Sequence, residues 1–321
     1  MIVDISLREV EMVLRVAELG SISRAAGALN IVQPALSRHI QKIEAAFGAA
    51  LFQRLPRGVR LTPAGQAFLE HGRRMLREWQ RAREAIAEGR SAEGAVVLGL
   101  SPSVAPVLLP DLVDRLRAEA PGVRLAVREA FSPALFHALL QAEVDLAVLT
   151  NPPPARALSI TPLVAEPIVL LSRPGTRPGQ AKVGLAELQR LPVLISAGIR
   201  RIVEEQLIAH GARLAVDLEI DSLEAIRRMA LRGGRTAMMP VSTFRPDLDT
   251  GALEASEVAG VHLHRLLVIA ERAGRPPPNP AEAAVQRAIR HCVERLADAG
   301  SFAVPTAGRR AREAAPRRRR P

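Results

Sequence analysis

The stretch Ser21–Phe47 constrains this chain more than any other, because its pattern predicts two short helices joined by a tight turn. Ser21 or Ser23 can cap the first helix, since a hydroxyl oxygen accepts from the free N–H groups of a first turn. Asn30 follows the last apolar residue of that helix and tolerates the left-handed backbone of a tight turn. Pro34 suits the start of the second helix, where its missing N–H is not needed. The stretch therefore predicts a helix-turn-helix.

The second of these helices has two different faces. Apolar residues recur at helical spacing and predict a buried stripe, formed by Leu36, Ile40, Ile43 and Phe47. The opposite face carries donors and no acid: Gln33, Pro34, Ser37, Arg38, Gln41 and Lys42. An α-helix fits the DNA major groove, where such side chains meet base edges and phosphates. A merely solvated face is the alternative, but the tight turn before it and the basic segment after it favour DNA binding.

A basic hairpin is predicted directly after this helix, over Leu51–Thr62. Two short β-like runs flank Pro56-Arg57-Gly58, which is a turn signal. The arginines on or beside the hairpin are Arg54, Arg57 and Arg60. A hairpin beside a recognition helix forms a wing, whose cations reach phosphates or the minor groove. Helix-turn-helix and wing together predict a winged DNA-binding domain over residues 1–62.

These motifs resemble the N-terminal domain of LysR-type transcriptional regulators. The shared run is AA-x-x-L-x-x-x-QPALSR-x-I, then LF-x-R, then GVRLT-x-AG, and the similarity covers residues 1–90. It implies a sequence-specific regulator that binds double-stranded DNA and responds to a small-molecule effector, as a homodimer or homotetramer. RNA polymerase is a candidate further partner, and no cofactor is expected. The chain departs from the family pattern at Val13, Val32 and His39, where an aromatic residue, a small hydroxyl residue and Gln are more usual.

A long linker helix is predicted over residues 63–90, opened by Thr62 as a cap and Pro63 at its first position. Its apolar residues follow a heptad spacing, at Phe68, Gly72, Met75, Trp79, Ala82 and Ile86. This seam predicts a helix–helix dimer contact, which the family resemblance also implies. The alternative is that the stripe packs on the helix's own chain.

Residues 94–299 alternate between short apolar strands and helices, which is typical of an α/β domain. The family resemblance implies two lobes like those of a periplasmic binding protein, with the effector between them. Lobe 1 is expected over about 94–163 and 270–299, and lobe 2 over about 164–268. The crossovers between the lobes are expected near Thr161–Glu166 and Leu266–Glu271.

Polar side chains follow several of the predicted strands or open the helices after them. They are Ser101, Ser103, Ser132, Thr150, Ser196, Arg200, Arg201 and Ser222. Ligands of open α/β sheets bind at the carboxyl ends of strands, and helix N-termini favour anions. Together these residues predict a polar effector cleft, although each hydroxyl alone could be a helix cap. The two arginines indicate a small anion such as a carboxylate or sulfate, unless both are simply solvated.

The net charge of +11 is concentrated at the two ends of the chain. Residues 1–90 hold 14 Arg or Lys against 9 Asp or Glu, and residues 299–321 hold 7 against 1. The middle is balanced, so the basic N-terminal domain is the part suited to a polyanion. Residues 300–321 are rich in Ala, Pro and Arg and are predicted to be a disordered basic tail.

Other functional classes find little support in the sequence. The seven histidines lack metal-ligand spacing, and His262 and His264 share a strand face without an evident carboxylate partner. There is no G-x-S-x-G motif and no phosphate-binding glycine loop, so the chain is not expected to be an enzyme. Cys292 is the only cysteine and is expected to be a buried thiol. With neither a signal pattern nor a long apolar run, the chain is predicted to be cytoplasmic and without membrane contact.

Overall fold

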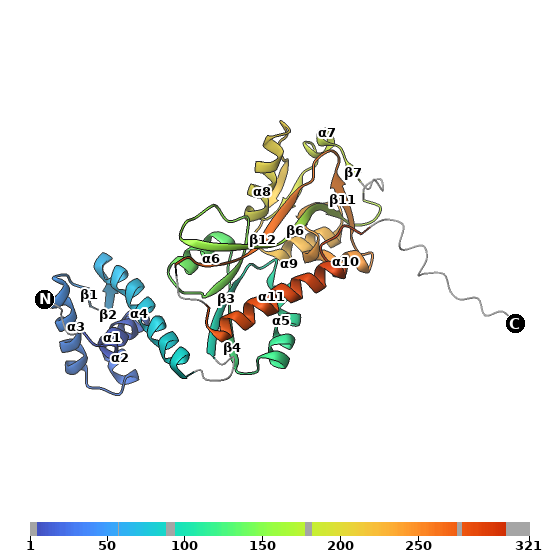
Figure 1. Ribbon diagram of the computed structural model, residues 1–321. Helices are drawn as coiled ribbons and strands as arrows, with labels where there is room; N and C mark the ends of the chain where they lie inside the picture. The colour runs from blue at the N-terminus through green and yellow to red at the C-terminus, as the bar shows by residue number, and fades with distance from the viewer. Residues whose placement is uncertain (1–4, 57, 88–93, 177–181, 275–277, 306–321) are drawn as a thin grey trace.

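The computed structural model describes residues 5–56, 58–87, 94–176, 182–274 and 278–305 (Figure 1). The N-terminal part contains α1 (Leu7–Leu19), α2 (Ile22–Ala28), α3 (Gln33–Phe47), β1 (Phe52–Leu55), β2 (Gly58–Leu61) and α4 (Pro63–Ala87). Strands β1 and β2 pair antiparallel, so the predicted helix-turn-helix and wing are confirmed.

The helix caps and turn residues of the N-terminal domain have the roles that the sequence predicts. The Ser21 hydroxyl accepts from the backbone N–H of Arg24 at 3.4 Å and caps α2. Asn30 takes a left-handed φ of 54° in the turn before α3. Pro34 lies in the first turn of α3, where no helical hydrogen bond is lost. The Thr62 hydroxyl accepts from the N–H of Gly65 at 3.0 Å and caps α4.

Two glycines allow the wing to pack closely against its neighbours. Gly58 has a φ of 100°, and a Cβ there would lie 2.4 Å from the carbonyl oxygen of Gly20. A Cβ on Gly65 would lie 2.0 Å from the carbonyl oxygen of Leu51. Both obstacles are backbone atoms, so a larger residue would have to push the wing away from α1 or α4.

Two predictions about apolar residues are wrong. Phe47 was expected in the buried stripe of α3, but it is 59% exposed and makes an edge-to-face contact with Phe68, at 5.6 Å between ring centroids. Phe68 was expected in a dimer seam, but it is buried in the core of its own chain. Gly72, next along that seam, would place a Cβ 2.9 Å from Val10 on α1. The first turns of α4 therefore complete the N-terminal core.

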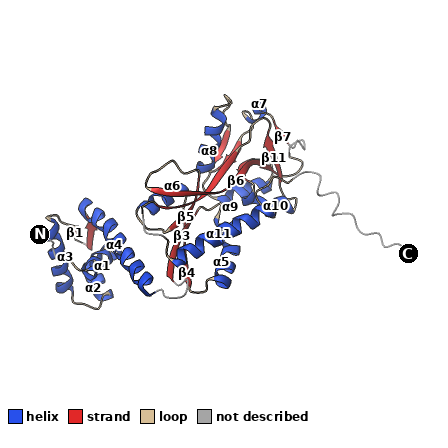
Figure 2. Cartoon of the chain, viewed as in Figure 1, coloured by secondary structure: helices blue, strands red, loops and turns tan. Residues whose placement is uncertain are grey.

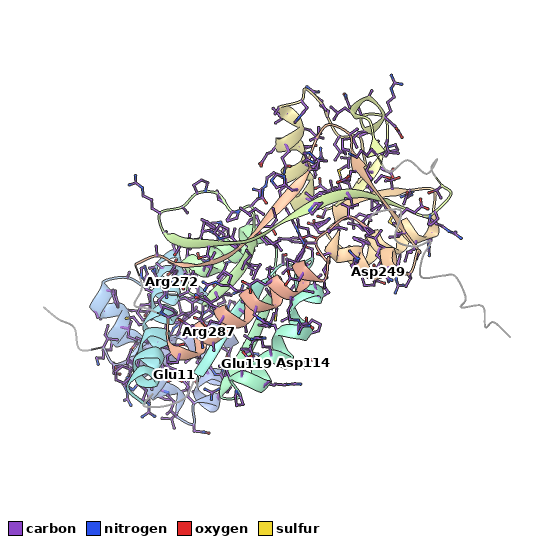
Figure 3. All side chains as sticks on the ribbon, turned by 45° about the vertical axis from the view of Figure 1, so that its right-hand side comes forward. Glu11, Asp114, Glu119, Asp249, Arg272 and Arg287 are labelled. Carbon is purple, nitrogen blue, oxygen red and sulfur yellow. The ribbon has the colours of Figure 1, made fainter. Side chains whose placement is uncertain are left out.

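Lobe 1 is a sheet covered by helices on both faces (Figure 2). Its parallel strands lie in the order β4 (Val123–Glu129), β3 (Gly94–Leu100) and β5 (Leu146–Thr150). One apolar cluster joins the sheet to α5 (Ala105–Glu119) and α11 (Pro280–Asp298), and another joins it to α6 (Ser132–Leu140). Charged residues lie on the outer faces of α5 and α11, as Asp114 and Arg287 show (Figure 3). Cys292 is 2% exposed, which confirms the predicted buried thiol.

Two long antiparallel strands connect the lobes, β6 (Leu158–Ser172) and β12 (His264–Arg272). Strand β6 pairs with β12 up to Pro167 and then, from Ile168, with β10 (Thr236–Pro240). The change of partner falls directly after the predicted crossover Thr161–Glu166. On β12, pairing with β6 begins at His264, and pairing with β5 of lobe 1 begins at Leu267, within the predicted segment Leu266–Glu271.

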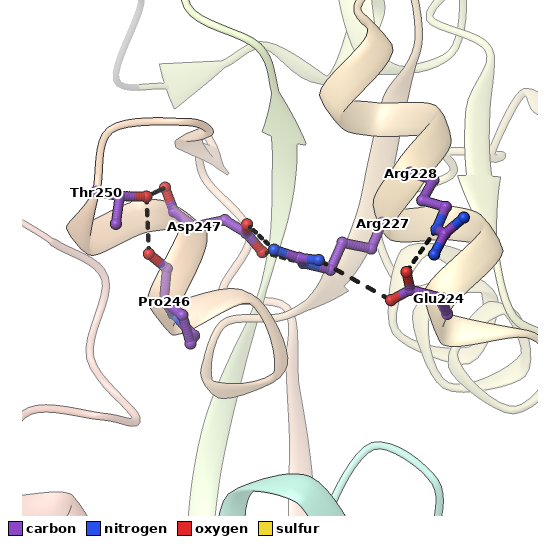
Figure 4. Close-up of polar contacts among 6 residues, drawn as sticks. All are labelled: Glu224, Arg227, Arg228, Pro246, Asp247 and Thr250. Atoms are coloured by element: carbon purple, nitrogen blue, oxygen red, sulfur yellow. Dashed lines mark hydrogen bonds and ion pairs between the residues drawn. The ribbon is translucent and has the colours of Figure 1, made fainter.

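Lobe 2 is the second half of the sheet, in the order β6, β10, β8 (Val193–Ile195) and β9 (Val216–Glu219). The main helices are α8 (Ala197–Ile208) and α9 (Leu223–Arg232). Sequence analysis missed the short elements β7 (Lys182–Val183), α7 (Leu185–Leu188), a 3-10 turn (Ser242–Phe244), α10 (Arg245–Asp249) and β11 (Glu254–Val258). Arg227 of α9 donates to both oxygens of the buried Asp247 on α10, at 2.8 and 2.7 Å, and joins these two helices (Figure 4).

The prediction that residues 300–305 belong to a disordered tail is wrong. Phe302 is 9% exposed and packs in the lobe 1 cluster. Arg245 donates to the carbonyl oxygens of Gly300 and Ala303, the latter at 3.2 Å. An aromatic side chain and these backbone acceptors therefore anchor the chain after α11, and the Arg-rich remainder, 306–321, lies outside the described residues. Among the described helices, none is long and apolar enough to cross a membrane.

Candidate nucleic-acid interface and effector cleft

The outer face of α3 presents most of the predicted donors to solvent. Leu36, Ile40 and Ile43 are buried, which turns the opposite side of the helix outward. Arg38 and Gln41 are exposed and form no hydrogen bond or ion pair with any described residue. The remaining members of this face are the exposed Gln33 and Pro34 and the half-buried Ser37. This face has the chemistry and shape that major-groove recognition requires.

Lys42, also predicted on the DNA-reading face, differs from Arg38 and Gln41 because its ammonium group is paired with an acid of α1. Its Nζ donates to Glu9 Oε1 of α1 at 2.9 Å, and His39 Nδ1 lies 3.0 Å from the same oxygen. The sequence contains no signal for this contact, because Glu9 is 33 residues away from Lys42. Lys42 and His39 therefore form the side of α3 that faces α1.

Glu9 is 5% exposed and receives hydrogen bonds at both carboxylate oxygens. Its Oε2 accepts from the backbone N–H of Ser6 at 2.9 Å and from the Ser6 hydroxyl at 3.1 Å. Burial raises the pKa of Glu9, but the hydrogen bonds from Lys42, Ser6 and His39 outweigh it and lower the pKa to about 2. The carboxylate is therefore charged across the physiological pH range.

The other end of α3 is fixed to the wing. Glu44 Oε1 accepts from the backbone N–H groups of Leu51 and Phe52 at 2.7 and 3.1 Å. Of the predicted wing cations, Arg54 and Arg60 are exposed, and Arg60 donates to Gln53 at 3.0 Å. Arg57 lies outside the described residues. Because Glu44 holds α3 to the start of the wing, the exposed donors of α3 and those of the wing keep a fixed arrangement.

The structure brings the predicted effector residues of lobe 1 together in two pairs. The hydroxyls of Ser101 and Ser103, after β3, lie 3.3 Å apart. The Ser132 hydroxyl accepts from the backbone N–H of Thr150 at 2.9 Å, which joins the start of α6 to the end of β5. Thr150 is 8% exposed, and its own hydroxyl has no partner among the described residues.

The predicted effector residues of lobe 2 form a third group, at the starts of α8 and α9. Ser196 precedes α8 and is 5% exposed, and Ser222 caps α9 by accepting from the N–H of Ala225 at 3.3 Å. Asp221 accepts from the first N–H of α8, on Ala197, at 3.2 Å. A carboxylate therefore already occupies the end of α8 where an anion would be stabilised.

Arg200 and Arg201, the two arginines predicted to contact an anionic effector, have different surroundings. Arg200 donates to Glu204 at 2.8 Å and to Glu219 at 3.0 Å, and hydrogen bonds to these carboxylates raise its pKa. Both acids compete with any bound anion, so the structure argues against Arg200 as an effector contact. Arg201 is exposed and has no partner among the described residues.

A buried ion pair lies where the two crossover strands meet. Arg265 of β12 and Glu166 of β6 are register partners, are 1% and 0% exposed, and join through a bond of 2.7 Å from Arg265 Nε to Glu166 Oε2. Arg265 Nη1 also donates to the Ser103 hydroxyl at 2.6 Å. Glu166 Oε1 accepts from the backbone N–H of Ser242 at 2.7 Å. This network connects a loop of each lobe through the crossover.

Sequence analysis missed both members of this pair. The available signal was a single charge in each of two otherwise apolar runs, LVAEPIVLL and HRLLVIA. Charges are rarely buried without a partner, so each run predicts that the other holds its counterion.

A separate cavity of about 210 Å³ lies between β6 and the β11–β12 connection. His262 and His264 line it, and so does Glu257, the nearby carboxylate that the sequence pattern did not reveal. Within the described part of the chain, no group of three His, Cys, Asp or Glu side chains is placed to hold a metal ion.

This combination of a winged helix-turn-helix and a two-lobed α/β domain defines a ligand-responsive DNA-binding protein. Residues 7–66 match the family model for "Bacterial regulatory helix-turn-helix protein, lysR family", and residues 89–296 match "LysR substrate binding domain". The chain belongs to the LysR family of transcriptional regulators, whose members bind DNA, respond to small molecules and form oligomers, and which is not a family of enzymes.

Known proteins support this assignment over nearly the whole chain. The HTH-type transcriptional regulator CfxR of Cupriavidus necator is 28% identical and is aligned over 91% of this chain and 93% of its own length. A full-length OxyR variant from Pseudomonas aeruginosa shares the fold, with a TM-score of 0.68, 24% identity and coverage of 90% and 95%. Full-length CbnR, solved in complex with its target DNA, shares it with a TM-score of 0.53, 21% identity and coverage of 90% and 100%.

The buried pair at the crossover generates a first prediction. Replacing Glu166 by Met leaves the Arg265 guanidinium charged and buried without a counterion, so unfolding free energy should fall by about 3–5 kcal/mol. The double variant Glu166→Met with Arg265→Met should lose much less than the sum of the two single variants. Urea unfolding of all four proteins measures this coupling, and strictly additive losses would contradict a functional ion pair.

Proposed function

We propose that this regulator reads base edges through Gln33, Pro34, Ser37, Arg38 and Gln41 of α3. Arg54, Arg57 and Arg60 of the wing contact the DNA backbone. The exposed, unpaired donors of Arg38 and Gln41, opposite the buried stripe of α3, carry this proposal. Lys42 is left out of the reading face because it is paired with Glu9. A regulator of bacterial type acts on chromosomal DNA, so we also propose a cytoplasmic location.

We propose a division of the chain into functional domains whose bounds follow its secondary-structure elements. Residues 1–62 form the winged helix domain, 63–90 the linker helix and 94–299 the effector domain. Residues 164–268 form lobe 2, and 94–163 with 270–299 form lobe 1. The anchored segment up to residue 305 extends lobe 1, since Phe302 packs in its core.

Arg38→Ala tests the reading face. Loss of one base contact should cost about 1–3 kcal/mol in binding to a selected duplex and should relax specificity at one position of the site. Competition assays with single-base variants of that duplex measure both effects. An equal loss on every sequence would identify Arg38 as a phosphate contact instead.

The exposed apolar side of α4 supports dimerisation through the linker helix. Met75 and Trp79, one helical turn apart on α4, are 45% and 54% exposed. A contiguous apolar patch exposed on a helix marks an interaction surface. The side chains of Ala82 and Ile86, predicted to continue this seam, lie outside the described ones.

Trp79→Glu should dissociate the linker-helix contact, because it places a charge in an apolar interface. Sedimentation velocity at a series of concentrations should show species of half the wild-type mass. Glu70→Gln, on the same helix but off the seam, provides the control. If the Trp79 variant kept the wild-type mass at every concentration, this seam would not be an oligomer contact.

The effector is proposed to lie between the lobes, near the hydroxyls of Ser101, Ser103, Ser132, Thr150, Ser196 and Ser222. Buried hydroxyls without partners on Thr150 and Ser242 support a polar ligand there, because such groups normally bind something. For an anionic effector, Arg201 is the better candidate cation, since Arg200 is paired with two acids. By binding one lobe arrangement better than another, the ligand would shift the balance between DNA-bound states.

Calorimetric titration with sulfate, acetate and benzoate tests the anion proposal. Arg201→Ala should weaken binding at least about tenfold, the equivalent of 1.4 kcal/mol, while Arg200→Ala should have a smaller effect. Unchanged affinity in the Arg201 variant would overturn the anionic assignment and leave a neutral polar effector.

A further inference from the structure

The carboxylate of Glu9 lies beside the proposed DNA-reading face of α3 and contacts two residues that flank this face, His39 and Lys42. Its Oε1 is 2.9 Å from Lys42 Nζ and 3.0 Å from His39 Nδ1, and its Oε2 is held by Ser6. Lys42 itself is half exposed, with 48% of its side chain open to solvent. An exposed lysine on a recognition helix would ordinarily be a phosphate contact.

The charge of Lys42 is neutralised before any DNA arrives. Each lysine or arginine that reaches a phosphate releases counterions and adds about 0.9 to the slope of log affinity against log salt. This contribution is the same for every DNA sequence, so it strengthens non-specific binding as much as specific binding. A lysine held on an interior carboxylate adds nothing to it.

The same carboxylate also fixes how α3 is turned. Lys42 and His39 are three residues apart on one side of α3, and both meet the single carboxylate on α1. Rotation of α3 about its axis would break these bonds, which connect the helix to the start of α1 through Ser6. Arg38 and Gln41 are the immediate neighbours of these anchored residues and remain free.

We propose that Glu9 is a specificity-determining positioning residue of this regulator. It withholds the charge of Lys42 from DNA phosphates and holds α3 so that Arg38 and Gln41 face the bases. The protein thereby keeps its non-specific affinity low without losing base readout. This inference rests on the proposed reading face of α3.

The test is a double-mutant cycle on the full-length protein with a random-sequence duplex. Glu9→Gln removes the charge but keeps an oxygen that can accept from Ser6. It should free Lys42, raise affinity for the random duplex and steepen the salt slope by about 0.9. Lys42→Gln alone should leave the slope at its wild-type value, and the double variant should return to that value.

A matched control is available on α1. Glu11 is exposed and pairs with no described residue, so Glu11→Gln changes the net charge equally without releasing a cation (Figure 3). It should leave the slope unchanged. On an in-vitro-selected duplex, Glu9→Gln should lower the ratio of specific to non-specific affinity, and Glu11→Gln should not.

Two outcomes would overturn the proposal. A fall of about 0.9 in the slope for Lys42→Gln alone would show that Lys42 already contacts a phosphate. If Glu9→Gln and Glu11→Gln changed the salt slope and the specificity equally, Glu9 would act only through its contribution to the net charge. The Lys42 variant decides the question even if the Glu9 variant does not fold. Failure of the reading face itself would appear separately, as an Arg38 variant that binds the selected duplex like wild type.

Discussion

The hydrogen bonds converging on Glu9 determine how the recognition helix is presented. One carboxylate closes the N-terminus of α1 through Ser6 and at the same time binds the side of α3 through His39 and Lys42. Glu44 performs the corresponding task at the far end of α3, where it binds the first strand of the wing. With an aliphatic core beneath them, these two acids make α1, α3 and the wing one rigid unit. The geometry of the basic DNA-binding domain therefore depends on two of its acidic side chains, Glu9 and Glu44.

In the effector domain, too, a buried carboxylate joins separate parts of the chain, here at the two crossover strands. Glu166 and Arg265 lie opposite each other on the two crossover strands, and their remaining hydrogen bonds reach Ser242 in lobe 2 and Ser103 in lobe 1. A buried ion pair of this kind adds little stability over an apolar pair, but it tolerates few alternative registers. The network includes Ser103, which we propose as an effector residue, so ligand binding there would involve the same hydrogen bonds as lobe orientation. The ligand would thus act where the lobes are coupled.

Much of this architecture could be predicted because its signals are local. Ser21 acts through a hydrogen bond to Arg24, three residues away, and Asn30 and Pro34 act through their own backbone conformations. Strands such as Val193–Ile195 are marked by short apolar runs. The errors concern contacts between distant parts of the chain. Lys42 and Glu9 are 33 residues apart, and Arg265 and Glu166 are 99 apart, so no periodicity relates them. Phe68 was misplaced for the same reason, since a heptad stripe does not reveal whether α1 or a second chain covers it.

The most direct test of the central claim is a high-resolution structure of the full-length protein bound to a selected duplex. We expect Arg38 and Gln41 to contact base edges while Lys42 Nζ remains on Glu9, as it is at 2.9 Å in the free protein. A complex in which Lys42 has left Glu9 for a phosphate, with Arg38 turned away from the groove, would contradict it.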